Sequence, residues 1–172
     1  MTPEFSRPQR ADTIGDGARE VEIEADAAER AGLARRFGLV AIDRLHARLS
    51  LRNEGGATIA TGRVEADVIQ ACTVTDDPLP QHISEPMSLR FVEPGGSVED
   101  EIELSGELMD TVEIEGGAVD LGEAAAETMM LALDPFPRSP RAATVLREAG
   151  VITEDEAKPA NPFAALKAKL GG

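Results

Sequence analysis

The stretch TVEIEGGAVDLGEAAAETMMLALDPFPR, residues 111–138, decides the fold of this chain. A short alternating strand pattern meets a turn at Gly116-Gly117, and an amphipathic helical pattern then runs to a double-proline stop. Asp120 is a good N-cap, because its carboxylate can accept from amides left free in the first helical turn, and Glu123 stands where it would complete a capping box. The spacing predicts a helix whose buried face holds Leu121, Ala125, Thr128, Met129 and Ala132.

The clearest strand pair lies upstream of this unit. From Ala41 to Arg52 apolar and polar residues alternate, which is the period of a half-buried strand. Gly55-Gly56 fits a two-residue hairpin loop, because glycine tolerates the positive φ of tight turns. This loop predicts one register, in which Leu51 faces Ala60, Ala47 faces Val64 and Leu45 faces Ala66 on the apolar face, while His46 faces Glu65, Arg44 faces Asp67 and Ser50 faces Thr61 on the polar face.

Shorter patterns complete the predicted domain. A strand is expected around Val21 and Ile23, a helix over residues 27–37 with an Asp26–Glu29 capping box, and a third strand over residues 81–92. Pro86 places that strand at a sheet edge or at a bulge. Residues 98–110 are expected to be mostly irregular, and residues 142–149 and 161–170 to form short helices.

These elements predict one α+β domain. We expect an N-terminal arm at residues 1–19, the domain at residues 20–140, and a C-terminal tail with short helices at residues 141–172. The predicted core is a curved, mostly antiparallel β-sheet, with barrel-like closure as one option, and the two capped amphipathic helices pack on or beside it.

Charge and composition restrict the partners. The 172 residues carry a formal net charge of -15, which argues against binding DNA or anionic lipid with the whole surface. The chain has five Phe, no Trp and no Tyr, so recognition by stacking of unpaired bases is not expected. Residues 30–63 hold seven Arg and two acids, whereas residues 85–134 hold fourteen acids and one Arg. We therefore expect one basic and one acidic surface, with no membrane partner.

The single cysteine, Cys72, excludes an intramolecular disulfide and a multi-cysteine zinc site. The N-terminus has no apolar run of a signal peptide, and no stretch approaches the length of a membrane span. We expect a soluble, cytoplasmic protein.

No pattern of residues predicts catalysis. The only two histidines, His46 and His82, are isolated, no glycine-rich phosphate loop is present, and the carboxylates show no calcium-loop spacing. We predict no enzyme activity, no metal and no cofactor. An enzyme with a carboxylate-lined, metal-assisted site is the alternative.

Recognition is the function that remains. Arg44, Arg48 and Arg52 form a row along one face of the predicted hairpin, and the planar guanidinium suits phosphate. Neighbouring acids could also neutralise this row, and the acidic half could hold a basic partner. The predicted RNA- or partner-binding residues are Arg35, Arg36, Arg44, Arg48, Arg52, Glu127 and Arg138.

Three segments together resemble a known family. They are DAAERAGLARRFGL (26–39), QACTVTDDPLPQHISEPM (70–87) and VDLGEAAAETMMLALDPFPR (119–138). In order and spacing they resemble the YceD family of bacteria and plastids, and its alphaproteobacterial branch in particular. Many members have Cys-x-Arg-Cys where this chain has Cys72-Thr73-Val74-Thr75, and a cysteine-rich tail that is absent here. A metal or redox role of those cysteines therefore does not extend to this chain.

The resemblance implies a non-catalytic factor of ribosome assembly. The family is linked to accumulation of large-subunit ribosomal RNA, so the implied partner is a ribosomal RNA precursor or a ribosomal protein. Glu127 and Arg138 are the better functional candidates, because capping and packing do not require them. The signature residues that the resemblance carries over are Cys72, Asp120, Leu121, Glu123, Glu127, Leu131, Pro135, Pro137 and Arg138.

Overall fold

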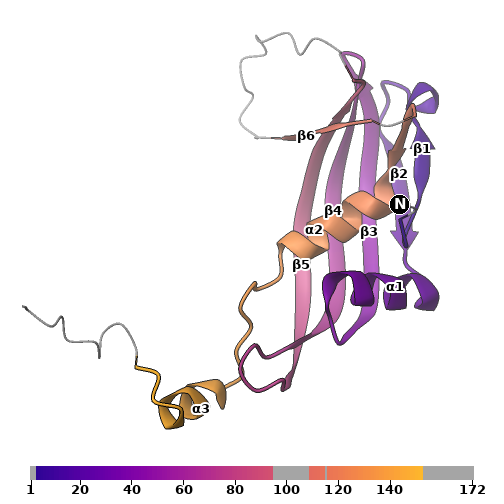
Figure 1. The fold of residues 1–172 in the computed structure, drawn as a ribbon. Helices are drawn as coiled ribbons and strands as arrows, with labels where there is room; N and C mark the ends of the chain where they lie inside the picture. Colours follow the sequence, from indigo (N-terminus) through magenta and orange to yellow (C-terminus); the bar gives the residue numbers. More distant parts are fainter. Residues whose placement is uncertain (1–2, 95–108, 115, 153–172) are drawn as a thin grey trace, which may run out of the picture.

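The computed structural model of this chain describes residues 3–94, 109–114 and 116–152. Five strands form one curved sheet in the order β2-β3-β4-β5-β6, and a second, two-stranded sheet pairs β1 with β7 (Figure 1). Strands β2 to β5 are antiparallel neighbours, and β6 runs parallel to β5. The elements are β1 (Pro8–Arg10), the short 3-10 helix η1 (Ala11–Thr13), β2 (Arg19–Glu24), α1 (Ala27–Phe37), β3 (Ala41–Glu54), β4 (Ala57–Ala71), β5 (Pro78–Val92), β6 (Asp110–Glu113), β7 (Ala118–Asp120), α2 (Leu121–Leu131) and α3 (Ala142–Glu148).

The β3–β4 hairpin has the predicted register. Leu51 pairs with Ala60, Ala47 with Val64 and Leu45 with Ala66, and each polar pair also matches the prediction. Gly55 and Gly56 have φ of 60° and 80°, as a tight primed turn requires. An irregularity between Ile42 and Arg44 inserts Asp43 and puts Ile42 on the same buried face as Leu45.

The sheet is open, so the barrel-like option is wrong. β2 and β6 lie at opposite ends of the strand order. Strand β5 begins at Pro78, earlier than predicted, and pairs with β6 only over Leu89–Val92. Pro78, Pro80 and Pro86 occupy alternate positions of β5, at which the backbone groups point away from β4 and toward the free edge. Proline has no backbone amide to donate at these positions. These prolines prevent another strand from pairing along that edge. They agree with the prediction that Pro86 lies at an edge of the sheet.

Both long helices lie across the same face of the sheet, which we call the inner face (Figure 1). Leu45, Leu49 and Leu51 of β3 are completely buried there, and Leu121 and Met129 of α2 are equally buried. Each such side chain contributes about 1.5–3 kcal/mol relative to an exposed one. This contact between sheet and helices is the core of the domain.

The two helices begin with different caps. Asp26 and Glu29 form the predicted capping box at α1, and Gly38 ends that helix in the left-handed conformation with φ 67°. Asp120 caps α2 by accepting from the amides of Gly122 and Glu123. The capping box predicted for α2 is wrong, because only Asp120 makes its part of it. The Glu123 carboxylate accepts from Arg36 of α1 instead of from the backbone amide of Asp120.

The N-terminal arm packs against the domain. Phe5 is fully buried, and Pro8–Arg10 pair with Ala118–Asp120 to form the small second sheet. The chain crosses α2 at Gly122, where a Cβ would come within 2.3 Å of the carbonyl oxygen of Phe5. The glycine in this helix is thus required by the close approach of the arm.

Two predicted segments fall largely or wholly outside the described residues. These are the irregular segment 98–110, of which only Met109 and Asp110 are described, and the short helix over residues 161–170. The predicted helix at 142–149 is present as α3. None of the helices in the described ranges has the length and apolar character needed to cross a membrane.

Candidate functional site

Within the described part of the chain, α1 and α2 both cover the inner face of the sheet, and neither lies on the opposite, outer face (Figure 1). Strand geometry places Arg44, Arg48 and Arg52 on this outer face, at alternate positions of β3. The predicted row therefore exists as a surface feature. The predicted register, in which Ala47 faces Val64, also implies which residues of β4 lie opposite this row.

Strand pairing turns the row into a two-dimensional patch. Arg48 lies directly opposite Arg63 of β4, and Ser50 lies directly opposite Thr61. Two arginines thus face each other across about 5 Å of sheet, beside a pair of hydroxyl groups. We call Arg48, Ser50, Arg52, Thr61 and Arg63 the arginine patch.

Some positive charge in this patch is matched by acids. Glu22 of β2 accepts from Nε2 of His46 at 2.7 Å and from Nε of Arg48 at 3.2 Å, and these two contacts hold the pKa of Glu22 below its usual value. Arg52 pairs with Glu54 at 3.0 Å. Arg63 instead donates to the carbonyl and hydroxyl oxygens of Ser84, both at 3.1 Å. Among the described residues it forms no ion pair.

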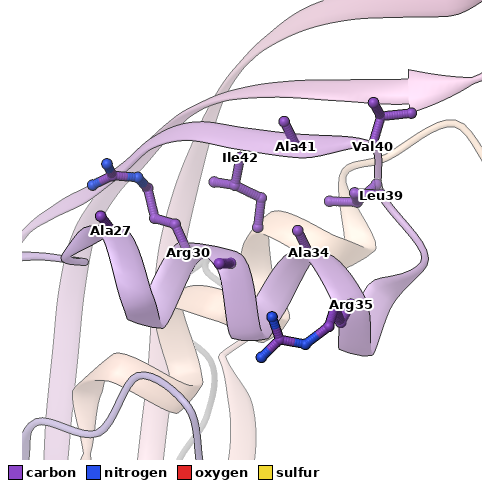
Figure 2. A pocket seen from close by; sticks show the side chains of 9 residues that line it. Ala27, Arg30, Ala34, Arg35, Leu39, Val40, Ala41 and Ile42 are labelled. Atoms are coloured by element: carbon purple, nitrogen blue, oxygen red, sulfur yellow. The ribbon is translucent and has the colours of Figure 1, made fainter.

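Arg35 and Arg36 lie elsewhere. Both belong to α1 on the other side of the sheet, so they do not extend the arginine patch. Arg30 and Arg35 line a hollow of about 280 Å³ between α1 and the start of β3. Figure 2 shows how the lining side chains lie on these two elements. Arg36 binds Glu123 and Glu4, with its closest contact to Glu4 at 3.2 Å. Its charge is therefore used inside the domain.

The signature residue Asp120 holds several parts of the fold together. Besides capping α2, it accepts from the hydroxyl of Ser6 and, at 2.8 Å, from the amide of Arg7. Leu121 is fully buried beside it. These two residues, with Glu123, are explained by the structure of the domain.

Other signature residues are not explained in this way. Glu127 and Arg138 are exposed, and within the described part of the chain neither makes an ion pair. Leu131 is 86% exposed although it is a large apolar residue. Pro137 is buried, whereas Pro135 is exposed beside Leu131 in a groove described below. In the described ranges, α2 and the proline segment after it thus carry charges without an ion-pair partner and exposed apolar surface.

Cys72 lies where the β4–β5 loop meets the segment after the prolines. Its side chain is fully buried, and its sulfur accepts from the amide of Ser139 at 3.2 Å. Burial raises the pKa of this thiol, but hydrogen bonding to the sulfur, above all from the amide of Ser139, outweighs that effect and lowers the pKa to about 6. Asp77 accepts from Thr75, Ser139 and Arg141 in the same junction, at 2.7–2.9 Å.

The acidic part of the sequence also forms a surface. A hollow of about 260 Å³ lies between α2 and strands β5 to β7, with Phe91 and Ile114 in its lining and Glu113 and Glu127 beside them. Asp120 and Glu123 line it too, but their carboxylates are engaged as described. Across residues 3–94, 109–114 and 116–152, no three His, Cys, Asp or Glu side chains are grouped to hold a metal ion.

Sequence reasoning missed several of these contacts. Ser139 and Arg141 were not connected with Cys72, since 67 residues separate the cysteine from Ser139 and no local pattern links them. Arg90 lies in the same cross-strand row as Arg52, at a polar position of β5. The alternation with Phe91 could have placed it on the outer face, although not beside Arg52.

The comparison with protein families gives the identity of the domain. Residues 60–169 match the family described as large ribosomal RNA subunit accumulation protein YceD. The chain belongs to the YceD family. No curated protein and no solved structure gives a significant match.

The YceD match divides the fold unevenly. It begins within β4 and includes β5, α2 and the proline stop, whereas β1, β2, α1 and β3 precede it. Arg63, Cys72 and the α2 signature residues therefore lie inside the match, and Arg44, Arg48 and Arg52 lie before it. The arginine patch crosses this boundary at the β3–β4 hairpin.

Proposed function

We propose that this YceD protein is a non-catalytic accessory factor of large ribosomal subunit assembly that contacts ribosomal RNA through the arginine patch. The family name links the domain to accumulation of large-subunit ribosomal RNA. The single observation that supports RNA contact is the direct pairing of Arg48 with Arg63 on the outer face of the sheet, which neither α1 nor α2 covers. Like charges placed opposite each other destabilise a sheet, so a ligand that neutralises both would relieve that cost.

The patch has the chemistry of a phosphate-binding surface. Guanidinium groups form paired hydrogen bonds to phosphate oxygens, and serine and threonine hydroxyls donate to phosphate and sugar. The low aromatic content disfavours stacking of bases. We therefore propose contact with the RNA backbone, guided by shape more than by base sequence.

The net charge of -15 limits where such contact occurs. Exposed charges are largely screened beyond about 8 Å at physiological salt, so a local patch can bind phosphate when the two are brought together. Long-range attraction to free RNA would nevertheless be weak. Contact within a ribonucleoprotein particle, where other groups supply the encounter, fits both facts.

A ribosomal protein is the second candidate partner. The acidic hollow beside α2 joins apolar surface at Phe91 to exposed carboxylates at Glu113 and Glu127. A basic protein segment with one apolar anchor would complement it. Affinity capture from cells, with and without RNase, separates the candidates, because only a protein contact survives RNase.

A charge-matched pair of variants tests direct RNA contact. Arg48→Glu/Arg63→Glu should weaken binding to ribosomal RNA fragments and reduce the slope of log affinity against log salt by about two for two lost phosphate contacts. Arg10→Glu/Arg147→Glu changes the net charge equally at exposed sites away from the outer face. An equal loss in both variants would show a general charge effect and reject the arginine patch.

A non-catalytic role is part of the same proposal. It is supported by the engagement of Asp120 and Glu123, two of the four carboxylates around the acidic hollow, in structural contacts. The enzyme alternative requires titratable groups that converge on one reacting atom. Retention of ribosomal RNA accumulation in cells that carry Glu113→Gln/Glu127→Gln would count against that alternative.

A further inference from the structure

An apolar groove of about 460 Å³ lies where α1, α2 and β4 end. Its apolar lining comes from Phe37 and Leu39 after α1 and from the end of α2 through the proline stop. We call it the proline groove. Its main apolar residues are Phe37, Leu39, Leu131, Leu133, Pro135 and Pro137.

Uncovered apolar surface is concentrated at this groove. Leu131 is 86% exposed and Met130 is 39% exposed, and both line it. Phe136, between the two lining prolines, is 71% exposed. Apolar residues exposed together in this way mark a surface that another segment covers.

The polar features of the groove select the charge of that segment. α1 and α2 both end here, and the C-terminal end of a helix favours a positive charge. The last turn of α2 contains no basic residue of its own. In the groove wall Gln70 is 7% exposed, and its Oε1 has no donor among the described residues, although its Nε2 donates to the carbonyl of Asp134.

One segment of the chain has the matching chemistry. Residues 161–170, NPFAALKAKL, which we call the tail segment, lie outside the described part of the structure. Phe163, Leu166 and Leu170 recur at the spacing of one helical face, beside Lys167 and Lys169. The three lysines of the chain all lie after residue 157.

The connection between the described chain and this segment is short. Residues 153–160 separate it from the last described residue, Ile152, and eight extended residues span about 26 Å. Pro137, in the groove wall, lies only fifteen residues before Ile152. The YceD match, residues 60–169, contains both the α2 side of the groove and nearly all of the tail segment, whereas Phe37 and Leu39 precede it.

We propose that the tail segment of the same chain occupies the proline groove. Its apolar side chains cover Leu131, Leu133 and the prolines, and its lysines lie at the C-terminal ends of α1 and α2. This contact is separate from the arginine patch and is measured without RNA, so its failure would leave the proposed function untouched.

A single introduced tryptophan reports on this contact. Because the chain has no Trp and no Tyr, Leu131→Trp would be the only emitter of its kind, at a position that is already exposed. In the full chain we expect blue-shifted emission and protection from acrylamide. The variant Phe163→Ser/Leu166→Ser/Leu170→Ser should remove both effects, whereas Ala164→Ser/Ala165→Ser/Ala168→Ser should retain them.

Two further measurements keep the test decisive. Ser84→Trp, on the outer face, should show the same emission in combination with every tail variant. In proteins that keep Leu131, the backbone amides near it should exchange hydrogen faster when the apolar tail residues are replaced by serine. The proposal would be overturned if the emission of Leu131→Trp were the same with and without the tail substitutions. Protection from acrylamide that increases with protein concentration would show that a second copy of the chain occupies the groove. Protection seen only with added ribosomal protein would show that this partner occupies it. Either result would reject occupation by the tail segment of the same chain.

Discussion

Arg36 of α1 and Glu123 of α2 join the two long helices through a bidentate ion pair. Nη2 of Arg36 lies 2.5 Å from Oε1 of Glu123, and Nη1 lies 3.0 Å from Oε2. Their side chains are 31% and 22% exposed, so water screens the pair only in part. Because Arg36 also reaches Glu4 at 3.2 Å, the same guanidinium connects α1, α2 and the N-terminal arm.

Removal of the Glu123 charge should destabilise the domain. Glu123→Gln keeps the shape of the side chain but weakens both hydrogen bonds from Arg36, and we expect a loss of about 1 kcal/mol, at the upper end for partly exposed pairs. Urea unfolding followed by circular dichroism measures the change. Glu127→Gln, one turn further along α2 at an exposed position, is the matched control and should change the unfolding midpoint little.

Gly122→Ala should displace the N-terminal arm. The added Cβ would lie 2.3 Å from the carbonyl oxygen and 2.9 Å from the carbonyl carbon of Phe5, which are backbone atoms that a rotamer change cannot move. We expect a loss of about 1–3 kcal/mol, as for other overpacked positions. Faster proteolysis near Arg7 should accompany it. Gly17→Ala meets no atom within 4 Å, and equal losses in the two variants would contradict the steric explanation.

Cys72 should make the stability of the domain depend on pH. The fold lowers the pKa of this thiol to about 6, below the value of about 8.5 for a free cysteine. A lowered folded pKa stabilises the fold fully above the unfolded pKa, and this contribution is lost as pH falls through about 6. The free energy of unfolding should therefore rise between these two pH values, and Cys72→Ser should lack that rise.

The comparison must separate the thiol from its neighbours. Asp77 and Arg141 share the junction, and hydrogen bonds from Thr75 and Ser139 lower the pKa of Asp77. Asp77 therefore titrates in acid, below the range that concerns Cys72. Parallel unfolding curves for the wild type and Cys72→Ser across the neutral range would reject a thiolate in the folded state.

The hairpin was the part of the fold most completely predictable from sequence. Alternation in β3, the Gly55-Gly56 turn and alternation in β4 each restrict the register, and a one-residue shift would expose Leu45 and bury Arg44. The helix caps at Asp26 and Asp120 are equally local, because their hydrogen bonds reach only two or three residues along the chain. Local patterns of this kind are strong enough to decide these elements.

The remaining contacts are decided by tertiary structure. Three residues of β1 pair with three of β7 across more than 100 positions of sequence, and runs that short carry no alternation to recognise. Glu123 had a good local partner in the capping box, but Arg36 offered a charged one. The candidate site is local in part, since the β3 row was visible in the sequence and the predicted hairpin register, with Ala47 opposite Val64, already implied that Arg48 faces Arg63.

The pairing of Arg48 with Arg63 gives a prediction that distinguishes function from folding. Arg63→Thr removes one of two facing positive charges and introduces a β-branched residue, so we expect a gain of about 0.2–1 kcal/mol in stability. The same variant should bind ribosomal RNA fragments less tightly, because one phosphate contact is lost. Thermal unfolding and RNA titration of one protein sample measure both quantities.

Arg44→Thr is the control in β3, since Arg44 lies opposite Asp67 instead of a like charge. Equal stability changes in Arg63→Thr and Arg44→Thr would show that the like-charge pair costs the fold nothing, and would remove the main support for a charged ligand on this face.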